Sequence, residues 1–405
     1  MKRRKFIKDA AVAGGATAVA ASTFPAPAIA QSRIEIAMVA TWGRDFPGLG
    51  TGAQRFAKRL SDMTDGRMNV TYFAANERVK AFDSFDEVAL NNLCARTSLV
   101  ITTVGPYALY GETLLRVCAQ SGTDYCDLTG EPQWIKRMIA LYEDDARASG
   151  ARIVNCCGFD SVPSDIGVKF LQQEALKKFG TMCDKVRLRV KAIQGGPSGG
   201  TVASGINTIT QAGKDRALRR ELRDLYSLCP PGHRNMVRQD EIRVMYDNEF
   251  KSWVAPFIMA TINTRVVLRS NALLNPSYAE QFRYDEGFLT GDGSRGQKRA
   301  KQLERLLKIS IGLLSVPPLR FFLTRFVLPK PGDGPSLDEQ ISGFYDFRFL
   351  GRTQHGDEIK VKLTGNRDPG YGSTAKILAQ AGVSLVSCLL YTSPSPRDGL
   401  LSRMP

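Results

Sequence analysis

The stretch that decides the fold reads LVITTVGPYALYGETLLRVCAQSGTDYCDLTGE from Leu99 to Glu131, and resumes as ARIVNCCGFDSVPSD at 151–165. Short apolar runs at 99–104, 125–128 and 153–154 alternate with segments of helical periodicity. Strands alternating with helices of about 10–15 residues predict a parallel, doubly wound α/β sheet. Gly, Pro, Asp, Ser and Thr crowd the three strand ends, where such sheets bind ligands. We therefore expect a ligand site at these ends.

The chain of 405 residues is long enough for two or three domains. Its net charge of +15 comes mainly from Lys2–Lys8, Lys214–Arg223 and Arg295–Lys308. None of these basic runs is interleaved with stacking aromatic residues, so we expect no nucleic-acid partner.

The eight cysteines include no C-x-x-C pair, and the chain has only two histidines, His233 and His355. This composition argues against a zinc site and a dithiol redox motif, and we expect no metal. Most cysteines lie in apolar segments, where a free thiol behaves as a small hydrophobic group. Reduced thiols of this kind indicate a cytoplasmic location for the main part of the chain.

The first thirty residues predict export, which disagrees with the cytoplasmic location that the reduced thiols indicate. Lys2–Lys5 is basic, Ala10–Ser22 is apolar and small, and Ala28–Ala30 has the pattern of a cleavage site. The adjacent Arg3 and Arg4 indicate a twin-arginine signal, which predicts a periplasmic location.

Residues 31–88 show a strand-like run at 34–42, a helix at 54–63 and a second strand at 68–73. Glycines 48 and 50 with Ala53 match a G-x-G-x-x-A dinucleotide pattern, but an insert separates them from the strand and weakens that interpretation. The run TWGRDFPGLGTGAQR, followed by the pattern DGR…V…A, resembles the start of a TRAP-transporter periplasmic solute-binding protein. The resemblance is to the organic-acid-binding branch of that family. The resemblance implies a truncated binding lobe.

A second resemblance covers residues 89–385. The segments LVITTVGPYALYGE, DYCDLTGEPQW, ASGARIVNCCGFDSVPSDIGVKFL and DPGYGSTAKIL resemble the saccharopine dehydrogenase-like oxidoreductases, most closely their trans-acting enoyl reductase branch. This family implies a partial Rossmann-type NADP-binding domain at 89–185, an α/β substrate domain at 186–370, and a helix at 371–385 that packs back on the first domain. It implies NADPH-dependent hydride transfer to an acyl or lipid-linked enoyl substrate, in a cytoplasmic or membrane-associated protein.

The resemblance also implies a site at the strand ends. Reduction of a double bond needs a proton donor beside the cofactor, and the sequence does not choose among Tyr107, Tyr110, Glu131 and Asp160. Gly105-Pro106 is alternatively a plain turn, and Asp160 or Asp165 can cap a helix that starts near Ile166, with capping favoured for Asp165. The residues implied to bind the cofactor are Thr103, Gly105, Pro106, Tyr107, Gly130 and Gly158.

One element of the family pattern is absent. No strand leading into a GATGFTG-like phosphate loop precedes Leu99, so the first half of the nucleotide site is missing and activity is expected to be impaired. Two family patterns that meet near residue 88 favour a chimeric chain. Alternatively, the strands at 34–42 and 68–73 with their helix replace the lost unit.

Three later segments complete the sequence. The glycine-rich 195–200 is interpreted as a connector rather than an anion-binding loop. Residues 295–328 are basic and amphipathic; we expect them to pack under the substrate domain, with contact to a membrane surface as the alternative. The proline-containing 386–405 predicts no regular structure and resembles an artefactual tail.

Overall fold

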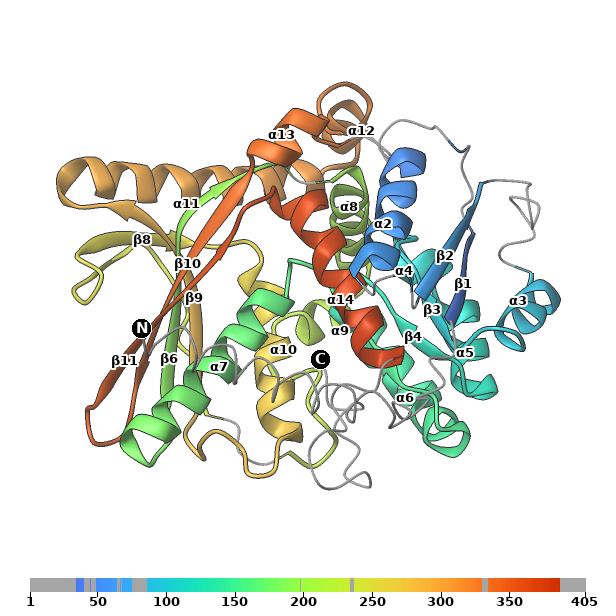
Figure 1. The fold of residues 1–405 in the computed structure, drawn as a ribbon. Helices are drawn as coiled ribbons and strands as arrows, with labels where there is room; N and C mark the ends of the chain where they lie inside the picture. Colours follow the sequence, from blue (N-terminus) through green and yellow to red (C-terminus); the bar gives the residue numbers. More distant parts are fainter. Residues whose placement is uncertain are drawn as a thin grey trace, which may run out of the picture.

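The described strands form three sheets, of two, three and six strands, with helices packed on them in a computed structural model (Figure 1). The predicted signal at 1–30 and all but the first residue of the predicted tail lie outside the described residues. The structure describes residues 34–39, 44, 49–63, 66, 68–74, 86–196, 198–233, 237–329 and 334–386.

Three short parallel strands form the predicted sheet, in the order β3-β4-β5. Leu99 pairs with Asp124, and Tyr125 pairs with Ile153. The strands are apolar because helices cover both faces, as is typical of parallel sheets. The predicted α/β class with a parallel sheet is confirmed. The elements here are α3 (Glu87–Cys94), β3 (Leu99–Ile101), α4 (Tyr107–Tyr110), α5 (Glu112–Ser121), β4 (Asp124–Cys126), α6 (Pro132–Ser149), β5 (Ile153–Val154) and α7 (Val162–Phe179).

A parallel strand–helix–strand unit precedes these strands. It consists of β1 (Ile34–Val39), α2 (Leu49–Met63) and β2 (Met68–Phe73). Leu60 of α2 shares a buried cluster with Leu99 of β3 and with the final helix, α14 (Thr374–Val386). The unit therefore belongs to the same core as β3-β4-β5, although no ladder between the described strands joins β1 or β2 to β3.

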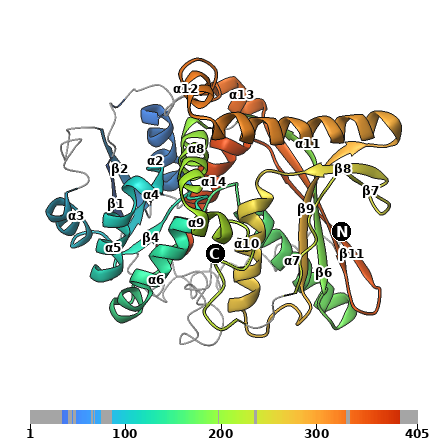
Figure 2. The same cartoon turned by 180° about the vertical axis from the view of Figure 1, so that it is seen from behind.

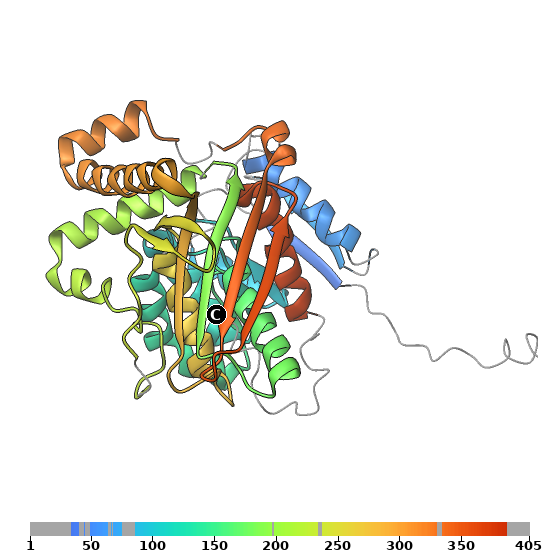
Figure 3. The ribbon, with the colours of Figure 1, turned by 90° about the vertical axis from the view of Figure 1, so that its left-hand side faces the viewer.

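The largest sheet has six strands in the order β11-β10-β6-β9-β8-β7, and only β6 and β9 pair in parallel. Helices α7 and α10 pack on its inner face in a cluster rich in aromatic residues, whereas Figure 3 shows no helix over its outer face. The elements are β6 (Lys185–Gln194), α8 (Gly199–Lys214), α9 (Arg216–Glu221), β7 (Met245–Asp247), β8 (Ser252–Pro256), α10 (Ala260–Leu273), β9 (Arg283–Gly291), β10 (Phe344–Arg352) and β11 (Glu358–Gly365).

The basic segment forms two helices, α11 (Gly293–Ser315) and α12 (Pro317–Phe326), followed by α13 (Leu337–Ser342). Only the first part of α11 packs on the sheet, where Gly296 and Ala300 are buried. The prediction that the whole of 295–328 packs under the substrate domain was wrong, because every side chain from 301 to 328 is exposed or half-buried. No single described helix is long and apolar enough to cross a membrane, although α11 and α12, bent by 107°, pass that composition test together.

Two other local predictions were wrong. Helix α7 begins at Val162 after Ser161, so Asp165 lies inside its first turn and cannot cap a helix that starts near Ile166. The run from Lys214 to Leu225, whose mixed charges predict a single solvent-exposed helix, is divided. Asp215 ends α8, and its side chain accepts hydrogen bonds from the N–H groups of Ala217 and Leu218 to start α9.

A buried polar cluster joins α7, α10 and β9. Asn263 donates to Ser164 Oγ at 3.1 Å and to Glu286 Oε2 at 3.0 Å, and Tyr284 donates to the other Glu286 oxygen. Burial raises the pKa of the Glu286 carboxyl to about 7, and it raises the pKa of Asp165 to about 7 against the nearby Lys169 cation.

We expect this burial to make stability fall as the pH rises. Asp165 stays protonated in the folded state up to about pH 7, whereas the unfolded chain releases that proton near pH 4. The free energy of unfolding should therefore drop between pH 4 and 7, by about 1–4 kcal/mol from Asp165 alone. Urea unfolding across this range should show a shallower fall in Asp165→Asn; equal slopes in the two proteins would contradict the account.

Candidate active site

A cleft of about 370 Å³ opens at the carboxyl ends of the parallel strands, where the sequence predicts a ligand site. Its walls come from the ends of β1, β3 and β4, from α2, from the start of α8, and from α13 and α14 with the turn before it (Figure 2). The residues that line it are Met38, Ala53, Arg55, Phe56, Arg59, Thr103, Val104, Gly105, Leu128, Ser198, Gly200, Leu337, Gln340, Ile341, Arg367, Gly370, Tyr371, Gly372, Thr374, Ala375 and Leu378.

Thr103 and Gly105 enter the cleft directly after β3, as predicted for the cofactor side. A Cβ on Gly105 would lie 3.3 Å from Ser204 Oγ of α8 and 3.4 Å from the Tyr107 ring. Glycine at this position therefore permits a close approach between the end of β3 and α8.

The Asp127 side chain connects the ends of β4 and β5 through hydrogen bonds, behind the cleft. It is fully buried, and its Oδ1 accepts from the N–H groups of Thr129 and Cys156 at 3.0 and 3.1 Å. Its Oδ2 accepts from Tyr125 Oη and Asn155 Nδ2 at 3.0 and 2.8 Å. These bonds hold Cys156 at a φ of +62°, which is uncommon for a residue other than glycine. Burial still raises the pKa of the Asp127 carboxyl, to about 6.

The DPGYG segment forms the opposite wall as a tight π-helical turn, Pro369–Ser373. The buried Asp368 carboxylate accepts from the N–H groups of Tyr371 and Gly372 at 2.9 and 2.7 Å. Thr374 Oγ1 donates to the Pro369 carbonyl at 2.8 Å and accepts from the Phe159 N–H at 3.2 Å. The turn is thereby tied to the loop after β5.

The glycine-rich loop 195–200 packs against this turn. A Cβ on Gly195 would lie 2.7 Å from Pro369 Cδ, so a larger residue would separate the two loops. Ser198 caps α8 by accepting from the Thr201 N–H, and both Ser198 and Gly200 line the cleft. The loop links β6 to α8 and places a helix N-terminus at the cleft, and its interpretation as a connector stays a prediction.

Three arginines give the cleft a cationic side. Arg55 and Arg59 come from α2, and Arg59 also donates to the Gly372 carbonyl at 3.3 Å. Arg367 donates through Nη1 to the carbonyls of Ile341 and Asn366, while its buried Nε has no hydrogen-bond partner. A buried guanidinium nitrogen without a hydrogen-bond acceptor destabilises the folded protein. The guanidinium groups of these three arginines therefore fit a ligand with phosphate groups, whose oxygens accept hydrogen bonds.

None of the residues predicted as proton donors lines the cleft. Tyr107 is buried, and its ring lies tilted against that of Trp134. Its hydroxyl donates to the Thr102 carbonyl and accepts from the Leu128 N–H, each at 3.2 Å. Glu131 is also buried, and its two carboxylate oxygens accept from the N–H groups of Tyr107 and Ala108 at 2.8 and 3.0 Å. In these positions Glu131 caps α4, and both residues shape the end of β3.

We expect Glu131→Gln to lower the free energy of unfolding by about 1–3 kcal/mol, because an amide retains only one of the two acceptor oxygens. Chemical denaturation measures this loss. The matched substitution Glu143→Gln, in a surface ion pair with Arg147 at 2.9 Å on α6, should change stability by less than about 0.5 kcal/mol. An unchanged Glu131→Gln stability, with activity abolished, would contradict the capping role and favour a catalytic one.

The other predicted residues surround the cleft at different depths. Pro106 is the N-cap residue of α4 next to Gly105, and Gly130 is exposed outside the lining. Gly158 lies behind the lining, where a Cβ would come 3.0 Å from Leu128. Asp160 is half-buried with no hydrogen bond among the described residues, and desolvation raises its pKa to about 6. The catalytic role of Asp160 stays a prediction.

Sequence reasoning missed the arginines and Tyr371. The available signals were the G-x-G-x-x-A run at the start of α2 and the DPGYG motif itself, whose acidic residue and glycines mark a tight turn. Neither signal shows that the two segments meet, because 313 residues separate Arg59 from its partner Gly372.

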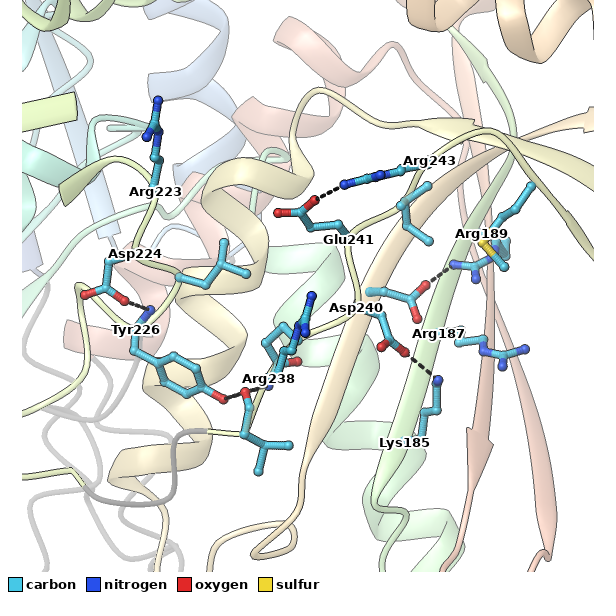
Figure 4. A pocket seen from close by; sticks show the side chains of 16 residues that line it. Lys185, Arg187, Arg189, Arg223, Asp224, Tyr226, Arg238, Asp240, Glu241 and Arg243 are labelled. Carbon is cyan, nitrogen blue, oxygen red and sulfur yellow. Dashed lines mark hydrogen bonds and ion pairs between the residues drawn. The ribbon is translucent and has the colours of Figure 1, made fainter. Parts of the chain in front are cut away.

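A second hollow of about 850 Å³ lies beside the mixed sheet (Figure 4). Several of its cations are paired within it: Lys185 with Asp240 at 2.6 Å, Arg189 with Asp285 at 2.5 Å, and Arg243 with Glu241 at 3.4 Å. It contains none of the predicted site residues, so the cleft is the better candidate.

No group of three or more His, Cys, Asp or Glu side chains in the described part of the chain is placed to hold a metal ion.

The chain is similar to several curated proteins. It is 36% identical over 334 residues to a Mycobacterium tuberculosis protein whose name provisionally assigns a trans-acting enoyl reductase, covering 78% of this chain and 80% of that protein. It is 33% identical over 374 residues to the trans-acting enoyl reductase of Mycobacterium bovis, covering 87% and 88%. Because 87% of this chain is about 352 residues, that alignment starts no later than about residue 56, within α2.

Among solved structures, the fold matches an amine dehydrogenase from Mycobacterium smegmatis with a TM-score of 0.39 and 12% identity, over 92% of this chain and 96% of that one. It also matches a meso-diaminopimelate dehydrogenase variant from Clostridium tetani with a TM-score of 0.38 and 13% identity, over 91% and 98%. These low scores add nothing about the site. No protein-family model matches the chain. The identities of 33–36% over at least four-fifths of each relative show that the chain belongs to the trans-acting enoyl reductase family.

Proposed function

We propose that the protein is an NADPH-dependent enoyl reductase that acts on an acyl or lipid-linked substrate in the cleft. The observation that carries this proposal is the meeting of three arginines, one with an unpaired buried nitrogen, at the carboxyl ends of parallel strands. Membership of the enoyl reductase family supports the reaction type.

The cationic side of the cleft suits the phosphates of a dinucleotide. Arg55, Arg59 and Arg367 would hold the phosphates, with the N-terminus of α8 as a further anion-binding group. Thr103 and Gly105 would lie along the ribose and nicotinamide. When bound, the reduced nicotinamide supplies the hydride, so the protein has to supply orientation and a proton.

The apolar side of the cleft suits an acyl chain. Phe56, Leu128, Leu337, Ile341 and Leu378 line it and would exclude water from the reacting double bond. Tyr371 is the one phenol among the described lining residues. We assign to its Oη the proton that the α-carbon of the substrate receives, after which solvent returns a proton to the phenolate.

Loss of NADPH absorbance in the presence of a 2-enoyl thioester tests the proposal. The purified full chain should oxidise NADPH only when the enoyl substrate is present and should form the saturated product in equal amount. This assay also tests the expected impairment from the missing GATGFTG-like loop. NADPH binding without turnover would support impairment, whereas no binding and no turnover would contradict the proposed function.

The sequence alone places the junction near residue 88, but the alignment with the Mycobacterium bovis relative begins no later than α2. For the residues before that alignment we propose a separate origin: a twin-arginine export signal followed by the start of a TRAP solute-binding protein. The observation in its favour is the TWGRDFPGLGTGAQR run. If an organic-acid site survives, a panel of keto acids and dicarboxylates should raise the melting temperature. No shift with any member of the panel would contradict binding, and cytoplasmic retention of the full chain would contradict export.

A further inference from the structure

Helices α11 and α12 lie at the edge of the molecule (Figures 1 and 3), and α11 packs on the sheet only through its first part. From 301 to 328 no side chain is buried, although fifteen of these 28 residues are Leu, Ile, Val or Phe. Phe321, Phe322 and Phe326 are 69%, 56% and 68% exposed. Apolar surface of this extent on an otherwise folded chain marks an interaction site.

The charges around this surface identify the partner. Between 295 and 328 the chain carries eight Lys or Arg residues and one acid, Glu304, which pairs with Lys308 at 3.1 Å. No ion pair of Arg299, Lys301, Arg305 or Arg325 is found among the described residues. Exposed aromatic and aliphatic side chains beside unpaired cations are complementary to a bilayer with anionic headgroups.

Exposed apolar side chains also lie at the mouth of the cleft, on a helix that Figure 3 draws apart from α12. Helix α13 follows α12 in the chain, and its Leu337 and Ile341 are 53% and 48% exposed. Both residues also line the cleft, next to Tyr371 on the turn before α14. Leu337 and Ile341 would therefore contact an acyl chain that enters the cleft.

We propose that α11 and α12 dock the protein on an anionic lipid surface, from which a lipid-linked acyl chain enters the cleft. The helices lie in the plane of the interface: their aromatic side chains enter the acyl region, and the arginines and lysines contact phosphate headgroups. Delivery to the cleft rests on the proposed function, whereas docking itself does not.

Vesicle sedimentation tests the docking. The full chain should sediment with vesicles of equal parts phosphatidylcholine and phosphatidylglycerol, and at least about tenfold less with phosphatidylcholine alone or in high salt. Phe321→Ser/Phe326→Ser and Lys301→Gln/Arg305→Gln should each weaken binding about tenfold or more. Phe170→Ser, on a 50% exposed phenylalanine of α7, is the matched control and should bind like wild type.

Three outcomes overturn the docking proposal. The first is no sedimentation with anionic vesicles, and the second is equal binding by Phe321→Ser/Phe326→Ser. The third is a dimer that this variant dissociates in the absence of lipid, which would show that a second copy covers the surface.

Delivery has its own assay. Phe321→Ser/Phe326→Ser should reduce a short, soluble enoyl thioester at the wild-type rate, but a vesicle-embedded enoyl lipid about tenfold more slowly. Equal rates with the embedded lipid would overturn delivery. If the wild type reduces neither substrate, the proposed function fails while sedimentation still decides docking.

Discussion

Tyr371→Phe is expected to lower the turnover of an enoyl substrate by about 100-fold or more, because it removes the proton donor assigned to the cleft. Asp368 holds the Tyr371 backbone through its N–H at 2.9 Å, so the phenylalanine ring should occupy the same place. NADPH affinity should therefore change by no more than about twofold. Steady-state kinetics and a binding titration on one preparation separate the two effects.

The control for this prediction is Tyr110→Phe. Tyr110 is a proton donor that the sequence alone also allows, but it is 47% exposed on α4 and does not line the cleft. Its substitution should leave turnover within about twofold of wild type. Full activity in Tyr371→Phe, or a loss in Tyr110→Phe alone, would contradict the assignment.

Asp127→Ala is expected to destabilise the protein by about 3–5 kcal/mol, the largest stability effect of any substitution considered. The change leaves the donors of Thr129, Cys156, Tyr125 and Asn155 without their acceptor in a dry environment. It also frees Cys156 from the contact that supports its positive φ.

Denaturant unfolding with near-UV dichroism should show this loss in Asp127→Ala. The matched control is Asp144→Ala on the exposed side of α6, which should change stability by less than about 0.5 kcal/mol. A loss below about 1 kcal/mol in Asp127→Ala would show that the two strand ends do not depend on this carboxylate.

The parallel sheet could be predicted because its signals are local. Leu99–Ile101 and the residues Tyr125 and Cys126 are short apolar stretches between helices, and Gly105 marks the end of the first strand. The positions of Thr103 and Gly105 in the cleft could be predicted for the same reason, because both residues closely follow a strand of the sheet.

The rest of the site depends on contacts that no local pattern encodes. Arg59 and Gly372 meet only after the whole chain has folded, and the unpaired Nε of Arg367 becomes visible only when the neighbours of that guanidinium are known. Tyr107 and Glu131 looked catalytic because polar residues after parallel strands often are. Their hydrogen bonds instead go to backbone groups around α4.

Binding of NADPH to the purified full chain tests the central claim, that the cleft is a nucleotide site, most directly. Nicotinamide fluorescence should rise and saturate with wild type, and Arg55→Ala should weaken the affinity about tenfold or more through loss of a charged phosphate contact. Lys58→Ala, on the same helix but in an exposed pair with Asp62, should bind like wild type. Absence of binding at millimolar NADPH, or equal affinities for Arg55→Ala and Lys58→Ala, would contradict the account.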